Sequence, residues 1–108
     1  MPENIDAKIQ EMVRRIVEAV HPDKIILFGS HARGEAGPDS DVDLLIIAPS
    51  ELPRWKRAVP IYRVLRGLGL PKDILWRTPQ EVEDWKDVRA HIIAIVLREG
   101  RVLYERAA

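Results

Sequence analysis

The chain has 108 residues, equal numbers of basic and acidic side chains (17 each) and no cysteine. Zero net charge provides no overall field to collect nucleic acid or anionic membrane, and the lack of cysteine excludes disulfides, thiolate catalysis and Cys-ligated zinc. With no apolar run near the ~20 residues of a membrane span and no signal-peptide pattern at the N-terminus, we expect one domain over residues 1–108, in the cytoplasm, with no direct contact to nucleic acid or membrane.

Helix and strand alternate in the first half of the chain. Apolar residues recur at helical spacing over 5–20, and the break at 21–23 ends that helix. The continuous apolar run 24–28 predicts a strand covered on both faces. A loop over 29–39, with three glycines, a proline and room for one helical turn, leads to a second buried strand over 42–48.

The middle of the chain predicts a second helical region and a third strand. Apolar residues at helical spacing span 52–65, but Pro60 lies inside this pattern. We therefore expect a kink or two shorter helices. The Gly-Leu-Gly sequence at 67–69 ends this region, and 73–76 forms a short strand.

The last third of the chain predicts further helix and a closing strand. Residues 78–81 have the composition of a capping box with proline at the first helical position. Helix should continue to 98, with a break near Asp87, and Gly100 ends it before a strand over 102–104. The whole pattern predicts α/β or α+β layering, with a mixed central sheet of about four strands flanked by helices.

A Gly-Ser pair follows the first predicted strand. Gly29 lacks a Cβ and would let a ligand approach the backbone, while the Ser30 hydroxyl can donate a hydrogen bond to phosphate. Arg33 could add charge-assisted bonds to the same phosphate. Gly-Ser pairs are also common in turns that bind no ligand. This motif alone therefore favours a structural turn over a phosphate-binding site.

An Asp-x-Asp pair opens the second predicted strand. On a strand, Asp41 and Asp43 point to the same face, roughly 6–7 Å apart along the chain. Their mutual repulsion calls for a cation, and carboxylate oxygens suit Mg²⁺ or Mn²⁺. The alternative is a polar turn that solvates the strand end. Combined with Gly29-Ser30 about ten residues earlier, the metal-binding interpretation is favoured.

Asp73 opens the third predicted strand much as Asp43 opens the second. If these strands are neighbours, three carboxylates meet and can hold two metals ~3.5–4 Å apart, an arrangement suited to phosphoryl chemistry. The alternative, a surface ion pair of Asp73 with Lys72 or Lys24, is equally compatible with the spacing.

The stretch from Phe28-Gly29-Ser30 through Gly34 to Ser40-Asp41-Val42-Asp43 resembles the nucleotidyltransferases of the DNA-polymerase-β superfamily. Over nearly its whole length the chain is similar to the minimal nucleotidyltransferases of prokaryotes (MNT or MntA-type). The strand at 73–76, the helix start at 78–81 and the closing segment 98–105 support this resemblance.

The resemblance implies a Mg²⁺-dependent enzyme that moves AMP from ATP to a hydroxyl group. Gly29 and Ser30, with Arg33, would bind the nucleoside triphosphate. Asp41 and Asp43 would hold two Mg²⁺ ions, which Mn²⁺ can replace, and Asp73 would complete the metal site and align or deprotonate the acceptor hydroxyl. A hydroxyl would attack the α-phosphorus and release pyrophosphate.

The resemblance also implies a partner. Such proteins often accompany a small helical HEPN toxin, and as antitoxins they transfer AMP to a tyrosine of that toxin. Two alternatives remain open: an antitoxin that acts by binding alone, and nucleotidyl transfer to a small molecule such as an aminoglycoside. Homo- and hetero-oligomers are both compatible with the sequence.

The remaining conspicuous residues receive structural interpretations. His31 is expected to be a solvated loop residue, and His91 a structural one. Trp55, Trp76 and Trp85 lie in apolar patterns typical of a core or a protein contact. Five basic residues are expected to form a solvated helix face: Arg54, Lys56, Arg57, Arg63 and Arg66.

Overall fold

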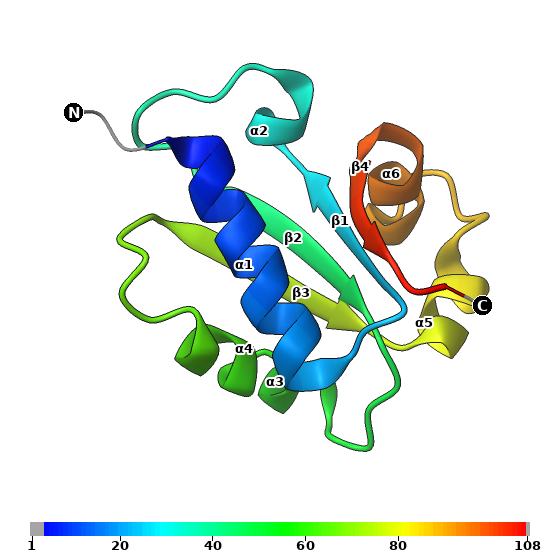
Figure 1. Cartoon of the computed structure of the whole chain (residues 1–108). Coiled ribbons are helices and arrows are strands. Elements are labelled where there is room, and N and C mark those ends of the chain that lie inside the picture. The colour runs from blue at the N-terminus through cyan, green and yellow to red at the C-terminus, as the bar shows by residue number, and fades with distance from the viewer. Residues whose placement is uncertain (1–3, 108) are drawn as a thin grey trace.

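The fold is built on one mixed, four-stranded β-sheet, which confirms the predicted class (Figure 1). The computed structural model describes residues 4–107. The strand order is β3-β2-β1-β4, in which β1 is antiparallel to both β2 and β4, and β2 is parallel to β3. The strands span Lys24–Phe28 (β1), Val42–Ile47 (β2), Lys72–Arg77 (β3) and Arg101–Glu105 (β4).

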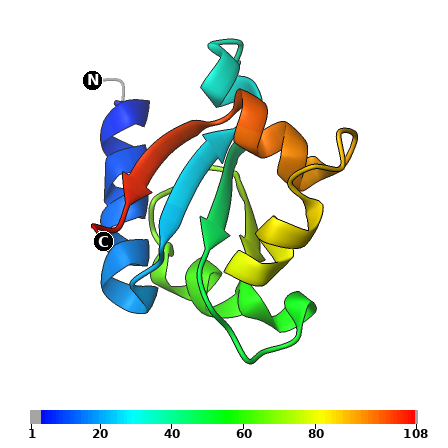
Figure 2. The same ribbon diagram turned by 90° about the vertical axis from the view of Figure 1, so that its right-hand side faces the viewer.

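Helices cover both faces of the sheet (Figure 2). One face carries α1, α3 and α4, the other α5 and α6, and the short α2 follows β1. No helix within residues 4–107 is both long and apolar enough to cross a membrane. The helices span Ile5–Val20 (α1), Ser30–Arg33 (α2), Arg54–Arg57 (α3), Val59–Val64 (α4), Pro79–Trp85 (α5) and Ile92–Glu99 (α6).

The two faces explain why most residues of β1 and β2 are apolar. Ile25 and Leu27 of β1 pack in one core cluster with Met12 of α1. Ile26 lies in a second cluster on the opposite face, with Ile93 of α6. Alternate side chains of a strand point to opposite faces, so a strand covered on both sides needs no polar positions.

Two interruptions of helix that the sequence predicted are present in the structure. The second helical region divides at Ala58, and Pro60 lies in the first turn of α4, where its missing N–H costs no hydrogen bond. The predicted break near Asp87 is present between α5 and α6. His91 caps α6, because its Nδ1 accepts the Ile93 N–H at 3.1 Å and its ring stacks on Trp85.

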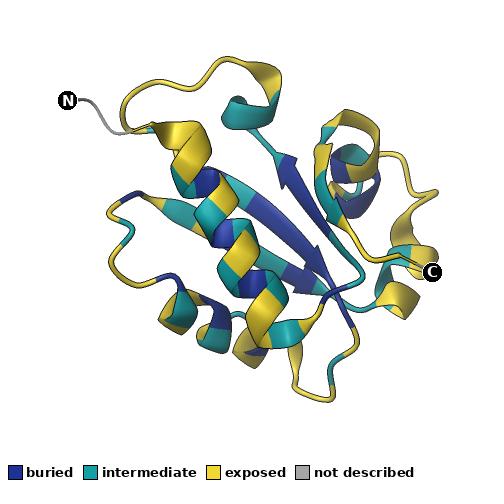
Figure 3. Cartoon of the chain, in the orientation of Figure 1, coloured by how far each residue is buried: buried dark blue, intermediate teal, exposed yellow. Residues whose placement is uncertain are grey.

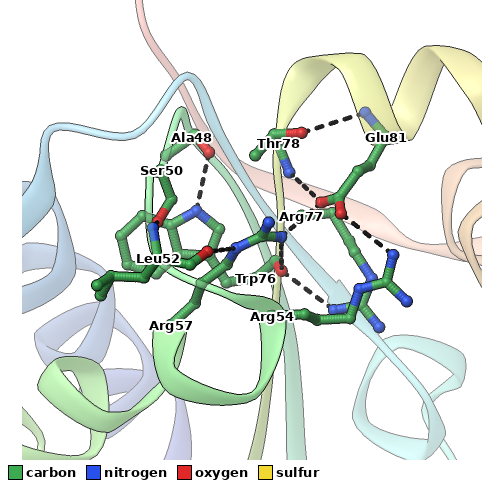
Figure 4. A network of polar contacts seen from close by, with 9 residues as sticks. All are labelled: Ala48, Ser50, Leu52, Arg54, Arg57, Trp76, Arg77, Thr78 and Glu81. Carbon is green, nitrogen blue, oxygen red and sulfur yellow. Dashed lines mark hydrogen bonds and ion pairs between the residues drawn. The ribbon is translucent and has the colours of Figure 1, made fainter.

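The predicted capping box at the start of α5 is confirmed, and it extends into a buried ion pair (Figure 4). Glu81 accepts the Thr78 N–H and also binds Arg57 at 2.5 Å. Arg57 is only 8 % exposed and donates to the carbonyl groups of Leu52 and Trp76. The expected solvated face is therefore wrong for Arg57, which joins α3 to β3 and α5.

Burial opposes the charged form of Glu81. The hydrogen bond from the Thr78 backbone and the guanidinium groups of Arg57 and Arg54 outweigh this effect and lower the pKa of Glu81 to about 2. Glu81 is therefore held as a carboxylate, and it joins the start of α5 to Arg57 and Arg54 of α3.

Candidate active site

Asp43 and Asp73 lie side by side on the parallel strands β2 and β3. They are register partners between β2 and β3, so both side chains come from the same end of the sheet. The second and third strands are thus neighbours, which is the condition for their carboxylates to meet. Asp43 is partly buried and Asp73 is exposed, so the two carboxylates differ in their access to solvent.

Asp41 precedes β2 and adds a third negative charge near this pair. Burial raises the pKa of Asp43, and the neighbouring charges of Asp73 and Asp41 raise it further. The positive charges of His31 and Arg33 offset only part of that effect. The site therefore concentrates negative charge that a bound cation would stabilise.

Gly29 supports the Asp43 carboxylate from the end of β1. Phe28 is the register partner of Asp43 in the antiparallel pair, so the next residue, Gly29, lies beneath that side chain. A Cβ built on Gly29 would overlap Oδ2 of Asp43 and lie 3.2 Å from its Cγ, and Gly29 has φ +74°. The lack of a Cβ at Gly29 therefore makes room for the Asp43 carboxylate.

Ser30 begins the helical turn α2, which follows Gly29 directly. Arg33, at the end of this turn, donates from Nε to Glu35 at 2.8 Å, and about half of its side chain is exposed. Gly29, Ser30 and the Asp43–Asp73 pair thus come together at one end of the sheet. Arg33 lies nearby and is paired with Glu35.

His31 is the site residue that the sequence did not indicate. It is partly buried, its Nε2 lies 3.3 Å from the Ser40 carbonyl oxygen, and its charge acts on Asp43. The expectation of a solvated loop residue is therefore wrong. No spacing pattern marks this histidine, because its place near the carboxylates depends on how the 34–40 loop returns to β2.

The donor set fits a hard divalent cation. Asp41, Asp43 and Asp73 offer only carboxylate oxygens, the ligands that Mg²⁺ and Mn²⁺ prefer. As the side chains stand, no group of three or more His, Cys, Asp or Glu within residues 4–107 is arranged so that it could hold a metal ion. The two-metal arrangement thus stays a prediction.

Curated relatives match part of the chain. "Putative protein adenylyltransferase MJ0141" of Methanocaldococcus jannaschii is 43 % identical over 53 residues, which cover 49 % of this chain and 52 % of that protein. "Putative protein adenylyltransferase MJ1305" of the same organism is 56 % identical over 46 residues, covering 43 % and 29 %. The match spans about half of the first relative's length and less than a third of the second's.

Solved structures share the fold. A structure described as that of a putative nucleotidyltransferase from Sulfolobus solfataricus superposes with a TM-score of 0.64 and 20 % identity, over 98 % of this chain and 93 % of the other. A structure described as "the toxin-antitoxin with AMP-PNP" gives a TM-score of 0.56 and 22 % identity, over 93 % and 73 %.

The family itself is identified by a match to nearly the whole chain. The sequence profile of the nucleotidyltransferase domain matches residues 7–103, a range that includes Gly29, Ser30 and all three carboxylates. This agrees with the mixed sheet and with the cluster of acidic side chains at its end. The chain belongs to the nucleotidyltransferase domain family.

Proposed function

We propose that this protein transfers AMP from ATP to a hydroxyl group, with Mg²⁺ as its metal. The observation that carries the proposal is the register pairing of Asp43 with Asp73 beside the Gly29-Ser30 turn. Asp41 lies two residues before Asp43 and adds its charge to the same site. This arrangement concentrates negative charge where the reaction requires both a cation and a phosphate contact.

Each residue has a role in the proposed reaction. Asp41, Asp43 and Asp73 would hold the divalent metal, two ions in all, which Mn²⁺ could replace. When bound, the metal offsets charge on the attacking and leaving oxygens. Asp73, the exposed member, would align or deprotonate the acceptor hydroxyl. That oxygen attacks the α-phosphorus of ATP, the bond to the β-phosphate oxygen breaks, and pyrophosphate leaves.

Gly29, Ser30 and Arg33 would bind the triphosphate. Ser30 starts the turn immediately after Gly29, next to the Asp43 carboxylate. Arg33 would have to exchange its exposed ion pair with Glu35 for a phosphate contact, and exposed ion pairs cost little to break. These assignments come from the family resemblance together with the placement of the three residues.

We further propose that the acceptor is a protein, namely a tyrosine of a HEPN-type toxin that the chain restrains as a cytoplasmic antitoxin. The two Methanocaldococcus relatives are named as protein adenylyltransferases, and one structural neighbour is described as a toxin–antitoxin. The HEPN partner and the tyrosine come from the resemblance to minimal nucleotidyltransferases.

Labelled ATP tests this proposal. The protein is incubated with Mg²⁺, a HEPN-type toxin as the candidate partner, and ATP labelled at either the α- or the γ-phosphate. Nucleotidyl transfer predicts label on the partner from α-labelled ATP alone. The double variant Asp41→Ala/Asp43→Ala should transfer none. Label from γ-labelled ATP, or undiminished transfer by the double variant, would refute the proposal.

A second candidate function is restraint by binding alone. It is favoured by the exposed apolar residues on α3 and α4, including Trp55, which are typical of a protein contact. Full protection of cells from the partner by the Asp41→Ala/Asp43→Ala variant would support this candidate. Loss of protection with retained complex formation would support catalysis.

A further inference from the structure

The outward side of α3 and α4 carries an unusual concentration of exposed apolar side chains. Trp55 is 76 % exposed, Leu52 47 % and Val59 45 %. Figure 3 shows much of α3 and α4 coloured as exposed. Leu52, just before α3, lines one groove together with Trp55 of α3 and Val59 of α4, so the three form one continuous stripe across the break between the two helices. We call this stripe the α3–α4 surface.

The fold does not require this stripe. The inward side of the same region is already occupied by Arg57, Ile61 and Leu65, all of which are buried. Ile61 and Leu65 belong to the core cluster beneath α1. An exposed tryptophan opposite a complete core is typical of a protein contact, where tryptophan often contributes much of the binding energy.

The surface is a groove bordered by positive charge. Its lining comprises Leu52, Trp55, Lys56, Val59, Pro60 and Arg63, which enclose about 470 Å³. Lys56 lies over the Trp55 ring, with Nζ 4.9 Å from its centroid. Arg63 and Arg66 form no ion pair with any residue in the described range 4–107. Between positions 50 and 66 there are five basic residues and one acidic residue, Glu51.

We propose that the α3–α4 surface binds an amphipathic helix of another protein, whose apolar stripe is flanked by Asp and Glu. Apolar side chains of the partner would fill the groove around Trp55, and its carboxylates would meet Lys56 and Arg63. A purely ionic partner would leave Trp55 and Val59 uncovered.

The surface is connected to the candidate active site through α4. The Tyr62 hydroxyl accepts the backbone N–H of Ile74, the residue after Asp73, at 3.0 Å. A protein bound to α3 and α4 is therefore held on the helix that borders the strand of the exposed carboxylate. On the proposed function, this surface would dock the acceptor protein; the binding of an acidic helix itself does not depend on catalysis.

The binding test uses two fluorescent peptides of about 18 residues, long enough to form a helix. Both carry leucine at helical spacing; one has Glu on the flanks and the other Lys. Fluorescence anisotropy should show saturable binding of the Glu peptide. Trp55→Ala should weaken it about tenfold or more, and Arg63→Glu should weaken the Glu peptide while improving the Lys peptide.

Trp85→Ala is the matched control, because Trp85 is also exposed (41 %) but lies on α5. It should change affinity by less than about twofold. Equal binding of both peptides, no saturable binding, or an equal effect of Trp55→Ala and Trp85→Ala would overturn the proposal. Analytical ultracentrifugation could also overturn it: a dimer of the unmodified protein that Trp55→Ala abolishes would mean that the α3–α4 surface binds a second copy of the chain.

The two proposals can fail separately. The Asp41→Ala/Asp43→Ala variant should bind the Glu peptide as the unmodified protein does, since its α3–α4 surface is unchanged. If the unmodified protein transfers AMP but does not bind the Glu peptide, the docking surface alone is refuted. If the unmodified protein binds the Glu peptide but transfers no AMP, the proposed function alone is refuted.

Discussion

Gly29 and Asp43 fit together so closely that the first cannot accept a side chain. A Cβ on Gly29 would overlap Oδ2 of Asp43, and the backbone there has φ +74°. We therefore predict that Gly29→Ala costs about 2 kcal/mol of unfolding free energy, from backbone strain at a positive φ and displacement of the carboxylate, and removes AMP transfer. Urea unfolding and the labelled-ATP assay measure the two effects.

Gly34→Ala provides the control for that substitution. Gly34 has nearly the same φ, +72°, but nothing lies within 4 Å of its would-be Cβ. It should therefore cost only the backbone strain, about 1 kcal/mol, and leave transfer intact. Equal effects of the two substitutions would show that the contact with Asp43 is unimportant.

Asp43→Asn should stabilise the protein at pH 7 while abolishing transfer. Burial and the charges of Asp73 and Asp41 raise the pKa of Asp43, so its charged form lowers stability above the ordinary carboxylate range. Asparagine removes that penalty, and we expect a rise in Tm of a few degrees. The gain should shrink as the pH falls and Asp43 becomes protonated.

Magnesium gives this prediction a second measurement. Mg²⁺ should raise the Tm of the unmodified protein by binding the folded state, and should raise that of Asp43→Asn much less. Asp84→Asn, on the exposed side of α5, should respond as the unmodified protein does. Both expectations would be contradicted if Asp43→Asn had a lower Tm at pH 7 than the unmodified protein and responded to Mg²⁺ as strongly as that protein does.

Asp73→Asn should reduce AMP transfer about a hundredfold or more with little change in stability. Asp73 is exposed, so its replacement leaves no buried group without a partner. The initial rate of label transfer and the Tm report the two effects. Transfer within about twofold of the unmodified rate would remove Asp73 from the proposed chemistry.

Glu81→Gln should flatten the loss of stability in acid. The pKa of Glu81 is lowered from 4.5 to about 2, so its contribution is complete above pH 4.5 and is lost as the pH falls toward 2. The unmodified protein should therefore lose stability over this range more steeply than Glu81→Gln. Urea midpoints between pH 2 and 6 measure the slope.

The matched variant for this experiment is Glu83→Gln, two residues away, whose side chain is 65 % exposed and is paired with Lys86 at the surface. Its acid profile should follow that of the unmodified protein. A profile of Glu81→Gln that is indistinguishable from that of Glu83→Gln would mean that the contacts with Arg57 and Thr78 do not stabilise the fold.

Periodicity predicted most of the fold because the core here is built from regular apolar patterns. The helix over 5–20 and the strand over 24–28 coincide with α1 and β1. Alternation of helix and strand also favoured a mixed sheet. The division of the second helical region into α3 and α4 was also predictable, because Pro60 cannot lie in a helix interior and is found in the first turn of α4.

The site was predictable where it depends on strand register and was missed where it depends on tertiary packing. Asp43 and Asp73 each open a strand, so adjacency of those strands brought them together. His31 carried no pattern and lies near Asp43 because of the following loop. Arg57 looked like part of a solvated face, but Glu81 and two backbone carbonyls make its burial favourable.

The most direct test of the acidic site uses Mn²⁺ as a paramagnetic substitute for Mg²⁺. In ¹H–¹⁵N spectra recorded with AMP-PNP, substoichiometric Mn²⁺ should broaden the amides of Asp41, Asp43, Asp73 and Gly29 first, and this selectivity should disappear in Asp43→Asn. Broadening centred on another acidic cluster, such as Glu11 and Glu18 of α1, with these four signals unchanged, would contradict the metal-dependent nucleotide site.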